Sequence, residues 1–110
     1  MTGKYKIEFT NWAESDIDDI VTYIAENDNV TDAVKVYLKL KKRISDLNEL
    51  ADRGRIVPEL KRIKVMEYKE IIYNPYRIIY KVENQVVFIV AVYDGRREID
   101  DVIFRRITEL

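Results

Sequence analysis

The chain has 110 residues, of which 47% are apolar and 35% charged, and its formal net charge is −1. This length allows one hydrophobic core and the composition is that of a globular protein, so we expect a single domain over residues 1–110. The sequence has no histidine and no cysteine. Disulfides, thiolate metal sites and imidazole catalysis are therefore excluded, and we expect neither a cofactor nor a metal ion.

Nothing in the sequence predicts contact with a membrane. The longest uninterrupted apolar run, residues 86–93, is far shorter than the roughly 18 residues that cross a bilayer. Residues 1–8 lack the apolar stretch of about 7 to 15 residues that a signal peptide requires. We therefore expect a cytoplasmic protein.

The small net charge hides a segregation of charge along the chain. Residues 1–52 carry a balance of −4, whereas the 29 residues from Arg53 to Lys81 carry +5. A local basic surface can bind an anionic partner even on a nearly neutral protein, because screening limits electrostatic reach to about 8 Å at physiological salt. The alternative is a solvated charged face without a partner.

The first half of the chain predicts one strand and two helices. Residues 5–9 alternate apolar and polar side chains, as a strand with one buried face does. Apolar residues then recur at helical spacing over residues 12–27, with Asn11 as the predicted N-cap and Glu14 in the capping-box position. Thr31 is the predicted N-cap of a second helix. The short connection between the two helices predicts an antiparallel pair.

The second half predicts a loop, three strands and a short helix. Gly54 and Pro58 end the second helix and predict a loop after it. An antiparallel meander follows, with strands over residues 63–73, 76–82 and 86–93, and helical spacing recurs over residues 99–107. The predicted fold is α+β with the order βααβββα, an antiparallel sheet with an N-terminal helical hairpin packed on it.

Three stretches of the chain stand out together. They are Arg53-Gly-Arg-Ile-Val-Pro-Glu-Leu60, Tyr76-Arg-Ile-Ile-Tyr-Lys-Val82 and Val87-Phe-Ile-Val-Ala-Val-Tyr-Asp-Gly-Arg-Arg97. In this order and on these elements, the chain closely resembles the RelE/ParE superfamily of bacterial and archaeal toxins from type II toxin-antitoxin pairs. The resemblance extends over residues 5–107 and implies a RelE/ParE-like fold.

The resemblance implies a growth-inhibiting toxin of the plasmid stabilisation type, which a cognate antitoxin neutralises in a toxin-antitoxin hetero-oligomer. ParE-like members of the superfamily inhibit DNA gyrase and are not nucleases, whereas RelE-like members cut messenger RNA in the ribosomal A site. Exposed apolar side chains on the helix pair, together with the basic surface of residues 53–81, would suit an acidic amphipathic tail laid in a groove.

An RNA-cleaving site needs a base, a cation for the pentavalent phosphorane and an acid for the leaving oxygen. By resemblance, Glu59 is the candidate base and Arg77 the candidate phosphate clamp, if the chain is an interferase. The lysine-rich second strand of RelE-like nucleases is replaced here by a stretch with Glu70, an acid where a phosphate would approach. Their C-terminal catalytic tyrosine or histidine is also missing, so Tyr73 or Tyr93 would have to substitute.

Structural roles are the alternative for the same side chains. Arg77 could lie on the solvent face of its strand and pair diagonally across the hairpin with Glu70. Glu59 could brace the Val-Pro-Glu-Leu loop, because ParE-like members without nuclease activity share that tetrapeptide.

The Gly95-Arg96-Arg97 junction begins the C-terminal segment that ParE-like toxins are thought to use against gyrase, and it is more similar to the ParE pattern than to the RelE one. The candidate target-binding residues are Arg96, Arg97, Lys69, Arg53 and Arg55. Arg96 and Arg97 could equally pair with Glu98, Asp100 or Asp101.

Three hypotheses follow. The first is a non-catalytic, ParE-like gyrase inhibitor, and the second is a ribosome-dependent endoribonuclease that uses Glu59 and Arg77. The third is a degenerate relative that binds an antitoxin but is not toxic.

Overall fold

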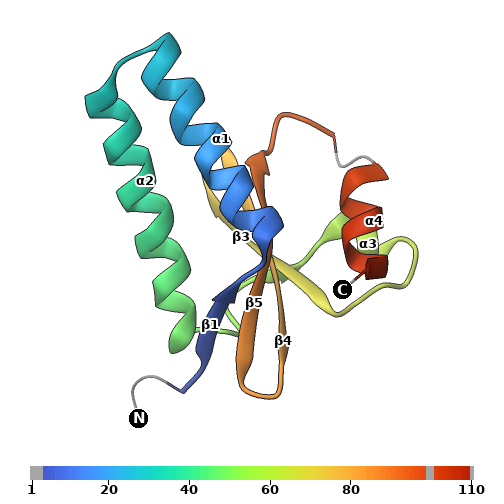
Figure 1. Ribbon diagram of the computed structural model, residues 1–110. Helices are drawn as coiled ribbons and strands as arrows, with labels where there is room; N and C mark the ends of the chain where they lie inside the picture. The colour runs from blue at the N-terminus through green and yellow to red at the C-terminus, as the bar shows by residue number, and fades with distance from the viewer. Residues whose placement is uncertain (1–3, 99–100, 110) are drawn as a thin grey trace.

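The computed structural model describes residues 4–98 and 101–109, which form a mixed five-stranded sheet with helices on both faces (Figure 1). The elements follow in the order β1 (Lys6–Phe9), α1 (Asn11–Asn27), α2 (Val30–Ser45), the 3₁₀ helix η1 (Asp46–Asn48), β2 (Arg55–Ile56), α3 (Pro58–Lys61), β3 (Tyr68–Tyr73), β4 (Tyr76–Glu83), β5 (Val86–Asp94) and α4 (Asp101–Glu109). The predicted α+β class and helical hairpin are confirmed. No helix in these ranges is long and apolar enough to span a membrane.

The strand order is β1-β5-β4-β3-β2. The predicted meander of β3, β4 and β5 is confirmed, and β5 lies between β1 and β4 as its apolar faces indicated. The sheet is not wholly antiparallel, however, because β1 pairs parallel to β5. A parallel pairing needs a long crossover connection, and here the helical hairpin begins that connection.

The two helices of the hairpin begin one or two residues earlier than predicted. Thr10, rather than Asn11, caps α1, because its hydroxyl accepts from the backbone N–H of Ala13 at 3.2 Å and donates to the carbonyl of Ile89 at 2.8 Å. Asn29, rather than Thr31, caps α2 through the backbone N–H of Asp32. In each case the cap is a Thr or Asn one or two residues upstream of the predicted residue. The predicted start of the last helix at residue 99 lies outside the described residues.

The segment between Gly54 and Tyr68, predicted as a loop followed by the start of a strand, contains the short strand β2 and the short helix α3. Val57 and Pro58 start α3, and β3 begins at Tyr68 instead of residue 63. The chain reverses at Lys64, whose φ is 63°, and the backbone N–H of Val65 then returns to the carbonyl of Leu60 at 2.9 Å. A proline at the first helical position is compatible with a helix start, so the breaker signal at Pro58 marked a beginning rather than an end.

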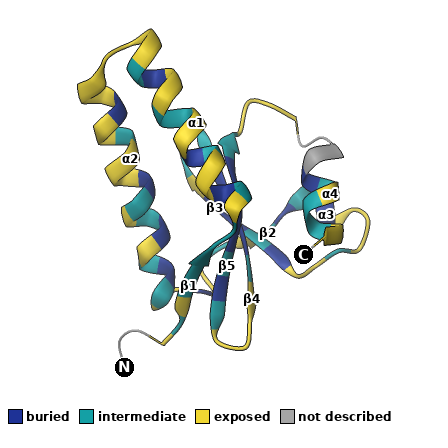
Figure 2. Cartoon of the chain, in the orientation of Figure 1, coloured by how far each residue is buried: buried dark blue, intermediate teal, exposed yellow. Residues whose placement is uncertain are grey.

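The sheet has one apolar cluster on each face, and buried side chains concentrate along the strands and the inner helix faces (Figure 2). The hairpin of α1 and α2 covers the first cluster, with Ile17, Leu40 and Ile44 among its members. On the other face, α3 and α4 contribute Leu60 and Ile103 to the second cluster. The sheet is therefore a shared layer between two helical layers.

An ion pair joins the two helical layers at the edge of β5 that β1 leaves uncovered. Asp16 of α1 accepts from Arg106 of α4 at 2.7 Å and from the backbone N–H of Val92 at 3.0 Å. Because β1 pairs with β5 only as far as Ile89, the Asp16 carboxylate accepts the backbone hydrogen bond of Val92 that a longer β1 would accept. The contact joins residues 90 positions apart in the chain.

Gly54 lies against Tyr80 with no room for a side chain. A Cβ on Gly54 would lie 2.7 Å from the carbonyl oxygen of Glu70 and still closer to the Tyr80 hydroxyl. That hydroxyl accepts from the backbone N–H of Gly54 at 2.9 Å and donates to the carbonyl of Ala51 at 2.8 Å. This contact anchors the chain just before β2.

We expect Gly54→Ala to lower the free energy of unfolding by about 1 to 3 kcal/mol, the usual cost of overpacking. Urea unfolding followed by circular dichroism measures the change. Tyr80→Phe serves as the companion variant, since it removes both hydrogen bonds without adding volume and should cost about 1 to 2 kcal/mol. An unchanged midpoint for Gly54→Ala would contradict the close approach.

Candidate functional site

Four charged side chains meet on the sheet face that carries α3 and α4. They come from four consecutive elements, and we call them the Arg–Glu tetrad: Arg55 of β2, Glu59 of α3, Glu70 of β3 and Arg77 of β4. Pro58 starts α3 and so places Glu59 in its first turn, over the strands. Both predicted catalytic candidates, Glu59 and Arg77, are therefore brought together.

Arg77 is the centre of the tetrad. Its Nη1 and Nη2 atoms donate to the two carboxylate oxygens of Glu59, each at 2.8 Å, and its Nε donates to Glu70 at 2.6 Å. The other oxygen of Glu70 accepts from Arg55 Nε at 2.8 Å. Three of the five N–H donors of Arg77 thus bind carboxylates.

Burial makes these contacts strong. The side chain of Glu70 is 0% exposed and that of Arg77 is 11% exposed, while Glu59 and Arg55 lie nearer the solvent. A buried charge must be paired and hydrogen-bonded to be tolerated, and the tetrad balances two cations with two anions. The alternative that Arg77 lies on the solvent face is therefore wrong, because Arg77 is buried beneath α3. The diagonal pairing with Glu70, which belonged to the same alternative, is confirmed.

The tetrad changes the acidity of its members. The hydrogen bonds from Arg77 lower the pKa of Glu59 from 4.5 to about 2, against an opposing effect of burial. The same contacts with Glu59 raise the pKa of Arg77. Glu59 is therefore a carboxylate at any pH above about 4, and it has little tendency to take a proton.

Tyr93 of β5 lies beside the tetrad, with Arg77 over its ring at 5.5 Å from the ring centre. Tyr73, the other tyrosine considered as a substitute acid, packs against the hairpin-side cluster on the opposite face. Of the two, only Tyr93 shares a face with Glu59 and Arg77. No group of three or more Asp or Glu side chains suited to a metal ion occurs within the described ranges.

The five predicted target-binding cations do not form one surface. Arg53, Arg55 and Lys69 lie before, on and next to the edge strand β2, Lys69 being on β3, whereas Arg96 and Arg97 follow β5, and β4 separates the two groups. Arg55 is held by Glu70, and Lys69 lies 3.6 Å from Asp52. Within the described residues, Arg53 and Arg97 make no ion pair.

Arg96 pairs with Asp94, its Nε donating to Asp94 Oδ1 at 2.9 Å, and not with Glu98. This contact lowers the pKa of Asp94 to about 2. The alternative partner Asp100 lies outside the described residues. Arg96 and Arg97 border a groove of about 550 Å³, whose other wall is formed by α1 with Asp19 and by Asp28 just after the helix.

Two parts of this arrangement were not predicted from the sequence. Arg55 was expected to be a free target-binding cation and Glu70 mainly an obstacle to phosphate, whereas the two residues form an ion pair. The sequence indicated this ion pair in part, since opposite charges on neighbouring strands interact when they share a face of the sheet. No sequence pattern indicated the position of α3, which decides where Glu59 lies.

The Glu59 contact should appear in the pH dependence of stability. Because the folded pKa of about 2 is below the ordinary value of 4.5, the contact stabilises the fold fully above about pH 4.5 and is lost as pH falls toward 2. We expect Glu59→Gln to be less stable than the unmodified protein at pH 7, with a difference that shrinks between pH 4.5 and 2. Urea titrations at stepped pH measure this difference, and a constant gap would contradict it.

Removing the buried anion should be costly. We expect Glu70→Ala to lower the free energy of unfolding by about 3 to 5 kcal/mol, because Arg77 and Arg55 lose a common partner. Arg53→Ala, at an exposed cation of the same region, should change it by at most about 0.5 kcal/mol. Equal effects of the two substitutions in chemical denaturation would show that the tetrad does not support the fold.

Residues 7–99 match the family described as "ParE toxin of type II toxin-antitoxin system, parDE". A chain from the chromosomal ParDE TA system of P. aeruginosa has a TM-score of 0.70 and 16% sequence identity, covering 84% of this chain and 98% of that one. A chain from the toxin-antitoxin complex RelBE2 of Mycobacterium tuberculosis has a TM-score of 0.61 and 16% identity, covering 83% and 98%. No curated protein sequence gives a significant match.

Proposed function

Because the chain belongs to the ParE toxin family of type II toxin-antitoxin systems, we propose that it acts without catalysis, by binding DNA gyrase. The observation that carries this proposal is the Arg–Glu tetrad. The two residues that an interferase would use as base and phosphate clamp are bound to each other there. A toxin with such a site needs another way to stop growth, and binding an essential enzyme is the one associated with ParE-like proteins.

Glu59 is poorly suited to remove a proton. A general base works best when its pKa lies near the operating pH, whereas the pKa of Glu59 is about 2. Its two oxygens are also both occupied by Arg77. To act on RNA, Glu59 would have to give up the ion pair that holds α3 on the sheet.

Arg77 is equally constrained as a phosphate clamp. A phosphate would have to displace Glu59 and approach the fully buried carboxylate of Glu70 on the same guanidinium. That negative charge, in a site shielded from water, opposes a second anion. The tetrad is thus better explained as a structural element than as an open catalytic site.

A cognate antitoxin completes the proposal. The similar solved structures come from a ParDE TA system and from the toxin-antitoxin complex RelBE2, and their likeness to this chain supports an antitoxin partner here. In the proposal, this chain and its antitoxin form a hetero-oligomer in the cytoplasm. Loss of the antitoxin releases the chain as a growth inhibitor of the plasmid stabilisation type.

The cations free to contact gyrase are fewer than the sequence suggested. Arg55 is bound to Glu70, Arg96 to Asp94, and Lys69 lies 3.6 Å from Asp52. Of the predicted set, Arg53 and Arg97 remain without an ion pair within the described residues. Of these, Arg97 lies on the segment between β5 and α4 and beside the groove along α1. We assign the principal target contact to Arg97.

One observation favours the second candidate, a ribosome-dependent nuclease. Tyr93 lies beside Arg77, so a carboxylate, a guanidinium and a phenol gather on one face, and these are the three group types that RNA cleavage needs. This reading requires a rearrangement on the ribosome that frees both Glu59 and Arg77. The third candidate, an antitoxin-binding relative that is not toxic, has no observation of its own.

Two assays on the purified protein separate the candidates. We expect it to inhibit supercoiling by gyrase and to leave messenger RNA intact in cell-free translation from a linear template. We expect Glu59→Gln to inhibit gyrase as the unmodified protein does. Arg97→Glu should weaken inhibition at least about tenfold, since it reverses a contact charge.

The control variant for Arg97→Glu is Arg96→Gln, which alters the neighbouring cation that Asp94 already holds. If messenger RNA is cut within codons and the cuts are absent with Glu59→Gln, the chain is a ribosome-dependent nuclease and the gyrase proposal is wrong. Neither inhibition nor cleavage, from a folded protein that binds its antitoxin, would identify a non-toxic relative.

A further inference from the structure

The helix α2 has two apolar faces, and only one of them is covered. Ala33, Leu40 and Ile44 are buried against the rest of the molecule. A second stripe, formed by Val30, Val34 and Leu38, repeats every four residues, and its members are 67%, 48% and 59% exposed. A surface helix needs one apolar stripe to fold, so the second one requires another explanation.

Charges flank this stripe in a complementary way. On α2, Lys35, Lys39 and Lys42 repeat at steps of four and three residues and therefore form a lysine stripe beside the apolar one. The neighbouring helix α1 has no lysine or arginine at all. Its exposed side is acidic, with Asp18, Asp19 and Glu26.

Most of these charges have no partner of their own. In the described part of the chain, Lys35, Lys39, Asp19 and Glu26 make no ion pair, whereas Lys42 binds Asp46 at 2.6 Å. The exposed side of the hairpin is thus an apolar stripe between a row of free cations on one helix and a row of free anions on the other. We call this surface the outer hairpin face.

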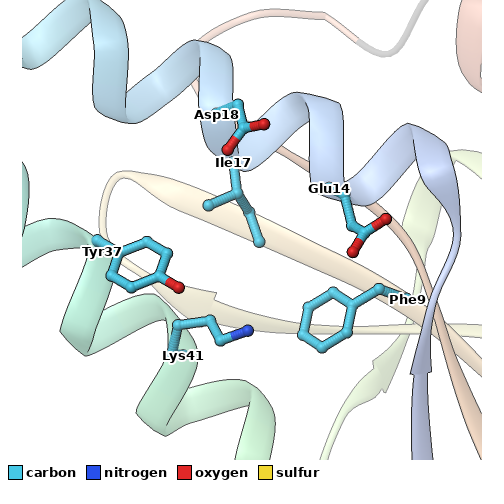
Figure 3. Close-up of a pocket in the computed structure, with 6 residues that line it drawn as sticks. All are labelled: Phe9, Glu14, Ile17, Asp18, Tyr37 and Lys41. Carbon is cyan, nitrogen blue, oxygen red and sulfur yellow. The ribbon is translucent and has the colours of Figure 1, made fainter.

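A pocket lies next to the outer hairpin face, but it does not cover the apolar stripe or pair its flanking charges. It has a volume of about 300 Å³ and lies between α1 and α2, near β1 (Figure 3). Lys41 already reaches into it, with its ammonium 4.4 Å from the centre of the Phe9 ring and 5.9 Å from that of Tyr37. Glu14 and Asp18 line the same pocket, so the chain itself supplies two carboxylates and one ammonium there. The uncovered surface is the stripe, not the pocket.

We propose that the outer hairpin face binds the same face of a second copy of this chain, related by a twofold axis. The occupant that fits an acidic helix beside an apolar stripe is an amphipathic helix with apolar and basic side chains, and α2 is such a helix. In a twofold pair, α2 of each copy lies over α1 of its partner. The lysines of α2 in each copy then face the acidic side chains of α1 in the other, and the twofold axis repeats this contact. Val34 and Leu38 of the two copies meet at the centre.

The size of the face sets the expected affinity. Helices of 16 and 17 residues are about 25 Å long and about 10 Å wide, so the hairpin offers about 500 Å² per copy. A total of about 1,000 Å² is at the low end for specific interfaces, and dissociation constants on the order of micromolar are expected there. The association should also weaken as salt rises, because its charges are exposed.

Sedimentation velocity at protein concentrations from about 1 to about 200 µM tests this inference. We expect a reversible monomer–dimer equilibrium at low salt, and Leu38→Glu should weaken it at least about tenfold, since a charge would enter the centre of the face. The matched control is Ile63→Glu on the turn after α3, where the apolar side chain is 56% exposed but lies outside the hairpin. This control should dimerise as the unmodified protein does.

A charge exchange tests the arrangement directly. The variant with Asp19→Lys and Glu26→Lys has a basic hairpin, and the variant with Lys35→Glu and Lys39→Glu has an acidic one. Each alone should remain monomeric, whereas an equimolar mixture should restore a dimer of both variants. A monomer at all concentrations of the unmodified protein, or no recovery in the mixture, would overturn the proposal. If Leu38→Glu left the self-association unchanged and abolished antitoxin binding instead, the antitoxin would be the occupant of this face and the twofold pair would be wrong.

Discussion

Arg77 is held between two carboxylates, and the arrangement of the neighbouring elements depends on this contact. Glu70 on the adjacent strand takes its Nε, and Glu59 on α3 takes its two terminal nitrogens. The helix α3 has only four residues, too few to be stable alone. Its position over the sheet therefore rests on the apolar side chains of Val57 and Leu60 and on the ion pair that joins it to β4.

The same contact limits the chemistry that the site can perform. A guanidinium that already binds two carboxylates is a poor receptor for phosphate, and a carboxylate with a pKa near 2 is a poor base. The charges that build this face of the fold are thus the charges that an interferase would have to release. This conflict, rather than the loss of one residue, is what favours a binding function for this ParE-family chain.

The two faces of the sheet have different outer surfaces. On the side of α3, two cations of the basic segment, Arg55 and Arg77, are held by Glu59 and Glu70. On the side of the hairpin, the charges of α1 and α2 are segregated by helix and mostly unpaired within the described residues. Candidate binding surfaces therefore include the hairpin and Arg97, beside those cations of the basic segment that make no ion pair within the described residues.

The sequence alone determined most of the elements, because their signals are local. The periodicities of α1, α2, β4 and β5 needed only neighbouring residues, and the predicted bounds of α1, β4 and β5 were accurate to within one residue. The end of α2 was misplaced, because the helix ends at Ser45 and not at the breakers Gly54 and Pro58. The order of the meander followed from short turns. The caps were misplaced because Thr and Asn stood at adjacent competing positions, and α3 was missed because a proline can mark the start of a helix as well as its end.

Tertiary structure alone decided the parallel pairing of β1, the burial of Arg77 and the contacts among charges far apart in sequence. Glu70 and Arg77 are neighbours across one hairpin, so their pairing was open to inference from the sequence. Glu59 and Arg77 meet only because α3 folds back over β4, and Asp16 and Arg106 meet across 90 positions at the edge of β5. Local pattern carries no information about such pairs, since packing of distant elements brings them together and the cost of leaving a buried charge unpaired then keeps them paired.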